Sequence, residues 1–140
     1  MALSAAPGAY AGTLERLHGD AIADPGRVVL VAEEEGRILA MAQLDPSKAG
    51  NASHRAEVQR VAVAASSRGK GVGRRLMEAV EVAARERGLT LVWLTTHNDS
   101  EACAFYESLG YTKLGVMPNY SRRPDGALWP GAFYFKDLSA

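Results

Sequence analysis

Short apolar and β-branched runs alternate along this chain with turn-forming segments, which is typical of a sheet built from several strands. The first two runs flank the turn Glu34-Glu35-Gly36 and predict an antiparallel hairpin. The predicted strands cover residues 28–33, 37–44, 54–64, 90–96, 111–116 and 131–138. Residues 117–129 contain Pro118, Pro124 and Gly126 and are expected to form a long loop.

Apolar residues at helical spacing separate these strands. They predict a helix over residues 73–87, in which Glu81 pairs with Arg85 one turn later. A second helix is predicted from Asn98 or Asp99 to residue 109, and Thr13 could cap a third that runs to residue 20 or 23. Because strand–helix–strand units favour parallel neighbours, strands 54–64 and 90–96 are expected to be parallel. We predict one α/β domain over residues 1–140, with residues 1–12 flexible.

The strand over residues 54–64 contains a break in its alternation. Val61 and Val63 keep a two-residue period, but Val58 precedes Val61 by three positions. This odd step predicts a β-bulge near Gln59 or Arg60. A regular strand with one imperfect position is the alternative interpretation.

A basic, glycine-rich loop follows this strand and leads directly into the helix. It reads Arg68-Gly69-Lys70-Gly71-Val72-Gly73-Arg74-Arg75. The free N–H groups and the dipole of a helix start favour an anion. Glycines let a ligand approach the backbone, and arginines can bind phosphate through two hydrogen bonds. Because strand, loop, helix and cations coincide, we predict a phosphate or pyrophosphate site rather than a flexible turn with solvated charges.

Residues 68–73 resemble the (Q/R)-x-x-G-x-(G/A) signature of the GCN5-related N-acetyltransferase (GNAT) family. The resemblance extends over about residues 28–138. It implies a mixed, mostly antiparallel central sheet with a parallel, splayed pair of strands in the middle, flanked by helices. Relatives usually begin with a further strand, which we expect to be absent here.

The same resemblance implies acetyl-coenzyme A (acetyl-CoA) as co-substrate, its pyrophosphate in the basic loop and its pantetheine arm on the bulged strand. The implied cofactor-binding residues are Val61, Ala62, Val63, Arg68, Gly69, Lys70, Gly71, Val72, Gly73, Arg74 and Asn98. For Asn98, a role as the cap of the second helix is an equally good interpretation.

Residues 102–111 resemble the second signature of the family, A-x-x-(F/L)-Y-x-x-L-G-(F/Y). This resemblance implies that Tyr106 lies beside the coenzyme sulfur as general acid, and a phenol with a pKa near about 10 can donate to a thiolate. Helical spacing alone favours a core aromatic residue at this position. No metal is expected in the site, because the histidines are scattered and Cys103 is the only cysteine.

An acceptor amine must lose a proton before it attacks, and we nominate Glu57 as the general base. It directly precedes the expected bulge and could act there directly or through water. His54 is the second candidate. By resemblance, the backbone N–H of Val61 or Val63 stabilises the oxyanion.

Segments around His54, residues 115–120 and residues 124–127 resemble the tabtoxin-resistance branch of the family, which acts on a small amino-acid-like β-lactam toxin. Members of that branch tend to carry Asp in a Leu-Asp-Thr triplet, but this chain has Thr95 at that position. Thr95 can form hydrogen bonds but is not a base. Tyr120, Arg122 and Arg123 could bind a substrate carboxylate or form a solvated turn.

Charge and composition bear on the binding partners and on the cellular location of the protein. The chain has 16 Lys and Arg against 16 Asp and Glu, so no overall basic field indicates nucleic acid. No signal peptide or membrane span is expected, and the low cysteine content suits a reducing cytoplasm.

We therefore predict a cytoplasmic acyltransferase that moves an acetyl group from acetyl-CoA directly to the primary amine of a small, amino-acid-like or antibiotic- or toxin-like molecule. A peptide or protein N-acetyltransferase and a catalytically inactive coenzyme A-binding protein are the alternatives. The identity of the amine and the oligomeric state, including a homodimer, stay open.

Overall fold

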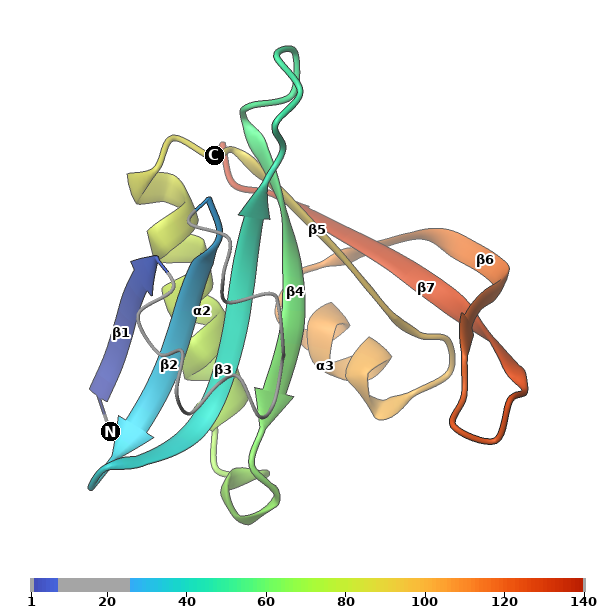
Figure 1. Cartoon of the computed structure of the whole chain (residues 1–140), viewed down its shortest axis with the longest axis horizontal. Coiled ribbons are helices and arrows are strands. Elements are labelled where there is room, and N and C mark those ends of the chain that lie inside the picture. The colour runs from blue at the N-terminus through green and yellow to red at the C-terminus, as the bar shows by residue number, and fades with distance from the viewer. Residues whose placement is uncertain (1, 8–25, 140) are drawn as a thin grey trace.

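The computed structural model describes residues 2–7 and 26–139 of the chain. Seven strands form one sheet in the order β1-β2-β3-β4-β5-β7-β6 (Figure 1). The strands are β1 (Ala2–Pro7), β2 (Val28–Glu34), β3 (Arg37–Pro46), β4 (Arg55–Val63), β5 (Leu91–His97), β6 (Thr112–Arg122) and β7 (Leu128–Asp137). The helices are the 3-10 turn η2 (Ala65–Ser67), α2 (Val72–Glu86) and α3 (Glu101–Ser108). Among the described strand pairs only β4 and β5 are parallel, which confirms the predicted mixed, mostly antiparallel sheet.

The first strand, expected to be absent, is present, so that expectation was wrong. β1 pairs antiparallel with β2, from Ala2 opposite Glu33 to Pro7 opposite Val28. Ala and Pro are poor strand formers, but strand propensity depends strongly on context, and the edge of the β2–β3 hairpin offers a full row of backbone partners. Residues 2–7 of the segment expected to be flexible therefore form a strand. Residues 8–12 and the helix predicted from Thr13 lie outside the described part of the chain.

The sheet splits between β4 and β5. These strands pair only through Arg55–Leu91, Ala56–Val92 and Glu57–Trp93, and beyond Glu57 they diverge (Figure 1). One arm consists of β1 to β4 with α2, and the other of β5, β7 and β6 with α3.

The predicted β-bulge lies at the start of this divergence. Against β3, the register of β4 passes from Gln43–Gln59 to Met41–Ala62, so three steps of β4 face two steps of β3. Arg60 adopts a left-handed φ of 53° at this point. Because a bulge bends and twists its strand, it accounts for the turning of β4 away from β5.

The two arms are held by a shared core and by polar contacts, of which the one between Lys136 and Glu81 is the most buried. Leu76, Met77 and Val80 of α2 are fully buried, and each such side chain contributes about 1.5–3 kcal/mol through burial. Lys136 Nζ of β7 lies 2.9 Å from Glu81 Oε1 of α2 and donates to the Leu109 carbonyl oxygen at 2.8 Å. Glu81 therefore pairs across the two arms instead of with the Arg85 predicted from helical spacing.

The long loop predicted over residues 117–129 is mostly strand, because β6 continues to Arg122 and β7 begins at Leu128. The register skips from Met117–Gly131 to Ser121–Trp129, and Asn119 in this bulge has a φ of 56°. Pro118 is tolerated since β6 is an edge strand. Proline and glycine here mark a bulged hairpin rather than an open loop.

Candidate functional site

The basic loop between η2 and α2 presents a row of backbone donors. Gly71 is the N-cap of α2 and, like Gly69, adopts a left-handed conformation, with φ of 77° and 74°. The first amide of this helix to find an acceptor is Arg75 N–H, which donates to the Gly71 carbonyl oxygen at 3.1 Å. None of the N–H groups of residues 69–74 donates to an acceptor in the described structure. A helix start with free donors is the arrangement that binds phosphate groups in many proteins.

Four exposed cations surround these donors: Arg68, Lys70, Arg74 and Arg75. Two of them also hold the local structure, because Arg68 Nε donates to the Val63 carbonyl oxygen at 3.3 Å and Arg74 Nη2 donates to Ser108 Oγ at 3.4 Å. No carboxylate of the described residues forms an ion pair with the four cations. Their charge is therefore available to an anionic ligand.

Gly73 brings the start of α2 against both neighbouring elements. A Cβ atom placed on it would lie 3.2 Å from Phe105 Cζ of α3 and 3.4 Å from Val63 Cγ2 of β4. Because this contact leaves almost no room for a side chain, the glycine fixes the distance between the basic loop and the end of the gap between β4 and β5.

The main chain of β4 faces this gap at two of the predicted residues. Ala64 N–H donates to the Leu39 carbonyl oxygen of β3 at 2.7 Å. Since successive residues of a strand point their amides in opposite directions, the amides of Val61 and Val63 point away from β3, toward the gap. The β4–β5 pairing has already ended at Glu57, so the amides of Val61 and Val63 have no partner strand on that side. The amide of Ala62, between them, points toward β3.

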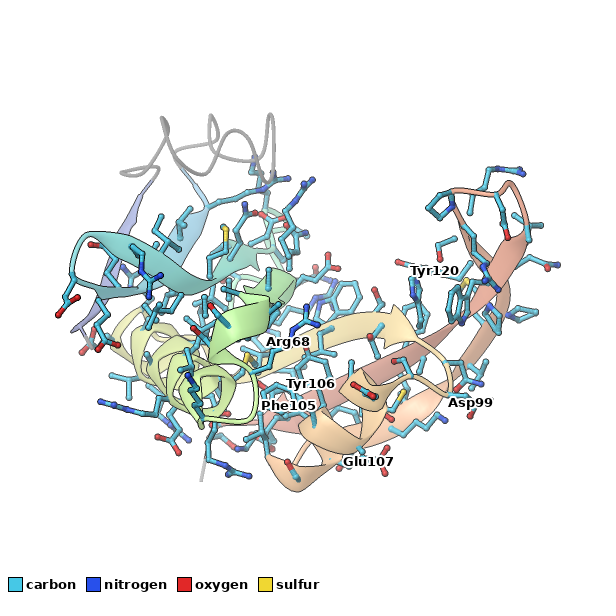
Figure 2. All side chains as sticks on the ribbon, turned by 90° about the horizontal axis from the view of Figure 1, so that it is seen from below. Arg68, Asp99, Phe105, Tyr106, Glu107 and Tyr120 are labelled. Atoms are coloured by element: carbon cyan, nitrogen blue, oxygen red, sulfur yellow. The ribbon has the colours of Figure 1, made fainter. Side chains whose placement is uncertain are left out.

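A cleft of about 330 Å³ occupies the gap. Its lining comes from β4, β5, α3 and β6, and consists of Val58, Arg60, Val61, Leu94, Thr95, Thr96, His97, Ala102, Tyr106, Tyr120 and Ser121. Figure 2 shows Arg68, Phe105 and Tyr106 grouped where the two arms meet, with Tyr120 farther out on the arm that carries β6. The cleft therefore extends from Tyr106, where the arms meet, to Tyr120 on the outer arm.

Tyr106 lies at the wall of this cleft and is only 7% exposed. Its ring packs against Tyr111 and Tyr134, with centroid distances of 5.8 and 6.3 Å. Burial raises the pKa of Tyr106 to about 12, so the phenol is protonated at neutral pH and is a weaker acid than a solvated tyrosine. A protonated hydroxyl at this position can donate a hydrogen bond or a proton to a strongly basic group.

Glu57 lines a different cavity, of about 330 Å³, at the paired end of β4 and β5 together with Arg55 and Trp93. Its Oε1 accepts a hydrogen bond from Gln59 Nε2 at 2.9 Å, and the same amide donates to Asp45 Oδ2 at 3.3 Å. The structure thus places the two predicted catalytic residues in neighbouring cavities rather than in one. His54 is exposed and lines neither cavity.

Asn98 does not cap α3, because the N-cap is Ser100. The side-chain oxygen of Asn98 accepts a hydrogen bond from Lys113 Nζ at 3.0 Å, and the backbone N–H of Asn98 donates to the Pro130 carbonyl oxygen at 3.0 Å. These contacts tie the end of β5 to β6 and β7.

His97 is a cleft residue that the sequence did not single out for this site. It lines the same cleft as Tyr106, and its ring stacks on Trp129 at a centroid distance of 4.2 Å. In the sequence, only the position of His97 directly after the strand predicted over residues 90–96 indicated that it could lie at the site. Thr95 and Tyr120 also line the cleft.

Arg122 and Arg123 belong to the hairpin tip instead. Arg122 Nη1 donates to the Gly126 carbonyl oxygen at 2.8 Å, and the Arg123 guanidinium lies 4.5 Å from the centre of the Trp129 ring.

Within residues 2–7 and 26–139, no group of three or more His, Cys, Asp or Glu side chains is placed to hold a metal ion. None of the helices in these segments is long and apolar enough to cross a membrane.

Comparison with solved structures supports this architecture. A ribosomal-protein-alanine N-acetyltransferase from Brucella melitensis superimposes with a TM-score of 0.81 over 99% of this chain and 100% of that one, at 24% identity. A Salmonella typhimurium chain whose structure was determined with its cofactor acetyl-CoA gives a TM-score of 0.78 over 100% and 95%, at 23% identity. At this level of identity the similarity establishes the fold.

Sequence comparison gives shorter matches to characterised proteins. The chain is 48% identical over 58 residues to mouse N-alpha-acetyltransferase 80, and 26% identical over 66 residues to the [ribosomal protein bS18]-alanine N-acetyltransferase of Haemophilus influenzae. These matches cover 41% and 47% of this chain, but only 18% and 45% of the two relatives. The model of the acetyltransferase (GNAT) family matches residues 4–111, which is more than half of the chain and includes the basic loop and Tyr106. The chain therefore belongs to the acetyltransferase (GNAT) family.

Proposed function

We propose that the protein is an acetyl-CoA-dependent N-acetyltransferase, formed by one domain over residues 1–140, that acetylates the primary amine of a small molecule. The observation that carries the proposal is the row of free N–H groups at residues 69–74, in which Gly73 lies against Val63 at the end of the unpaired edge of β4. A phosphate site next to an unpaired strand edge suits a ligand that combines a diphosphate with an extended amide arm, as coenzyme A does.

Each part of the coenzyme has matching groups in this proposal. The diphosphate binds the N–H groups of residues 69–74 and the side chains of Arg68 and Arg74. The pantetheine amides pair with the main chain of Val61 and Val63, and the thioester then lies in the cleft beside Tyr106.

The reaction is a direct transfer. The nitrogen lone pair of the amine attacks the thioester carbonyl carbon, and the carbon–sulfur bond breaks. The amine gives one proton to Glu57 through water, since the carboxylate lies in the neighbouring cavity. The departing thiolate receives a proton from Tyr106, and a Val61 or Val63 N–H stabilises the oxyanion.

A peptide or protein amine is the second candidate acceptor. The mouse relative is named an N-alpha-acetyltransferase, and the Haemophilus influenzae relative is named for acetylation of the alanine of ribosomal protein bS18. This favours testing a peptide with an N-terminal alanine beside small amines.

Thiol release from acetyl-CoA, measured with a panel of small primary amines and an alanine-terminated peptide, tests the proposal. Calorimetric titration with coenzyme A is run alongside. We expect binding of coenzyme A and turnover on at least one small amine. Binding without turnover, with no effect of Tyr106→Phe, would indicate an inactive coenzyme-binding protein, and failure to bind coenzyme A would refute the proposal.

A further inference from the structure

An open apolar cavity lies beside the cavity of Glu57. It has a volume of about 430 Å³, and most of its lining residues are apolar or aromatic. The lining residues are Arg55, Leu91, Trp93, Leu114, Phe133, Tyr134 and Phe135. Leu114 is 73% exposed, so its side chain is accessible to a ligand.

The two cavities adjoin each other, because Arg55 and Trp93 contribute to the lining of both. Trp93 is the register partner of Glu57 on one side and of Phe135 on the other. The rings of Trp93 and Phe133 are nearly parallel, at 5°, with a centroid distance of 6.3 Å. The two stacked rings give this cavity an aromatic wall, and Trp93 extends it to the cavity that Glu57 lines.

Two groups of opposite charge, the Glu57 carboxylate and the Arg55 guanidinium, lie where the two cavities meet. Glu57 and Arg55 lie on the same face of β4 two residues apart, which is about 6–7 Å along a strand. Asp45 is already engaged, because Arg27 Nε lies 3.6 Å from its Oδ1 and Gln59 donates to its Oδ2. The Arg55 guanidinium forms no ion pair with any described residue. An anionic group of a ligand can therefore bind Arg55 while a cationic group binds Glu57.

The junction also lies at the mouth of the gap. Glu57–Trp93 is the last registered pair of β4 and β5 before the strands separate. An ammonium group in this mouth can therefore face the gap that leads to Tyr106 and give its proton to Glu57 through water.

Resting on the proposed N-acetyltransferase function, we propose that the acceptor is a free α-amino acid with an aromatic or large aliphatic side chain. Its amino group binds at Glu57, its carboxylate binds Arg55, and its side chain covers Trp93, Phe133 and Leu114. The adjoining cavities offer a carboxylate, a guanidinium and an apolar surface, which together complement a hydrophobic zwitterion and disfavour a polyamine.

Acceptor selectivity measured as kcat/KM tests this assignment with wild-type protein and acetyl-CoA. The panel contains L-phenylalanine, L-tryptophan, L-leucine, L-alanine, glycine, putrescine and L-phenylalaninamide. We expect at least tenfold higher kcat/KM for phenylalanine than for alanine. We also expect at least a tenfold loss when the carboxylate is replaced by the amide.

Two variants separate the contributions of charge and of apolar contact. Arg55→Gln should raise KM for phenylalanine about tenfold or more, leave kcat little changed, and have no such effect on phenylalaninamide. Leu114→Ser should raise KM for phenylalanine but not for glycine. Arg85→Gln and Val82→Ser, on the exposed side of α2, are the matched controls and should leave both constants unchanged.

The outcomes distinguish this proposal from the function on which it rests. Turnover that shows no preference for apolar side chains and no response to Arg55→Gln would overturn the acceptor assignment and leave the transferase intact. A Leu114→Ser variant that changes sedimentation from dimer to monomer without changing KM would assign the apolar face to a second copy of the chain and overturn the assignment as well. Absence of coenzyme A binding in a parallel titration would instead refute the proposed function.

Discussion

Replacing Tyr106 with phenylalanine removes one hydroxyl from the wall of the cleft and little else. The hydroxyl makes no hydrogen bond to a described residue, and the ring keeps its packing against Tyr111 and Tyr134. We therefore expect the free energy of unfolding at pH 7 to change by less than about 1 kcal/mol. The affinity for coenzyme A should also be retained, because the diphosphate and pantetheine contacts come from other residues.

The effect on the rate should be much larger. A positioned general acid contributes about 10²–10⁴-fold, which corresponds to roughly 3–5 kcal/mol of the activation barrier. We expect kcat of Tyr106→Phe to fall by about 10²-fold or more. Steady-state thiol release with a saturating amine measures this change, and titration with coenzyme A controls for binding. A kcat within threefold of the wild type would refute the role of Tyr106 as general acid.

Alkaline unfolding provides an independent check on the burial of the phenol. The pKa of Tyr106 rises from 10.0 to about 12 in the folded state. A raised folded-state pKa stabilises the protein fully below pH 10, and this stability is lost as the pH rises through 12. Two pKa units correspond to about 3 kcal/mol. Between pH 8 and pH 12, Tyr106→Phe should therefore lose up to about 3 kcal/mol less than the wild type in denaturant titrations. Equal losses in the two proteins would contradict the burial.

Three further substitutions test the packing that positions the site. Gly73→Val should lower the free energy of unfolding by about 1–3 kcal/mol, because the new side chain overpacks against Phe105. The control Gly50→Val, whose Cβ atom would meet nothing within 4 Å, should be tolerated in the same thermal melts. Equal effects of the two substitutions would contradict the close approach of Gly73 to Phe105. Lys136→Met should lower the free energy of unfolding by about 2–3 kcal/mol, because it leaves the buried Glu81 carboxylate without its cation. A double variant that also carries Glu81→Leu should recover most of this loss. Gln43→Met should raise the melting temperature, because the fully buried Gln43 amide has no hydrogen-bond partner in the described structure. An unsatisfied buried polar group costs about 1–3 kcal/mol. A lower melting temperature would show that the amide has a partner.

Much of the site architecture follows from local sequence patterns. The phase slip between Val58 and Val61 indicated the bulge, and the structure places it at Arg60. The glycines of the basic loop indicated a helix start with free donors, and α2 begins at Val72. These features are local, because backbone conformation at a glycine or a bulge depends on only a few neighbouring residues.

Features that depend on tertiary contacts were missed. The partner of Glu81 is Lys136, 55 residues away, although helical spacing favoured Arg85. β1 forms because a sheet edge is available to it, and β6 passes Pro118 because it lies at the opposite edge.

The relation between Glu57 and Tyr106 also could not be read from the sequence. It depends on how far β4 and β5 diverge, and the divergence places the two residues in neighbouring cavities. The alternation of Phe133 and Phe135 indicated one face of a strand. Only the strand order shows that this face adjoins Glu57.

The most direct test of the account observes the amides of the basic loop during ligand binding. In a ¹H–¹⁵N correlation spectrum, titration with coenzyme A should shift the N–H signals of residues 69–74 downfield, since each amide gains a phosphate acceptor. Titration with pantetheine, which lacks the diphosphate, should leave these signals in place and shift only those of Val61 and Val63. Saturable binding of coenzyme A with unchanged amides at residues 69–74 would contradict the central claim.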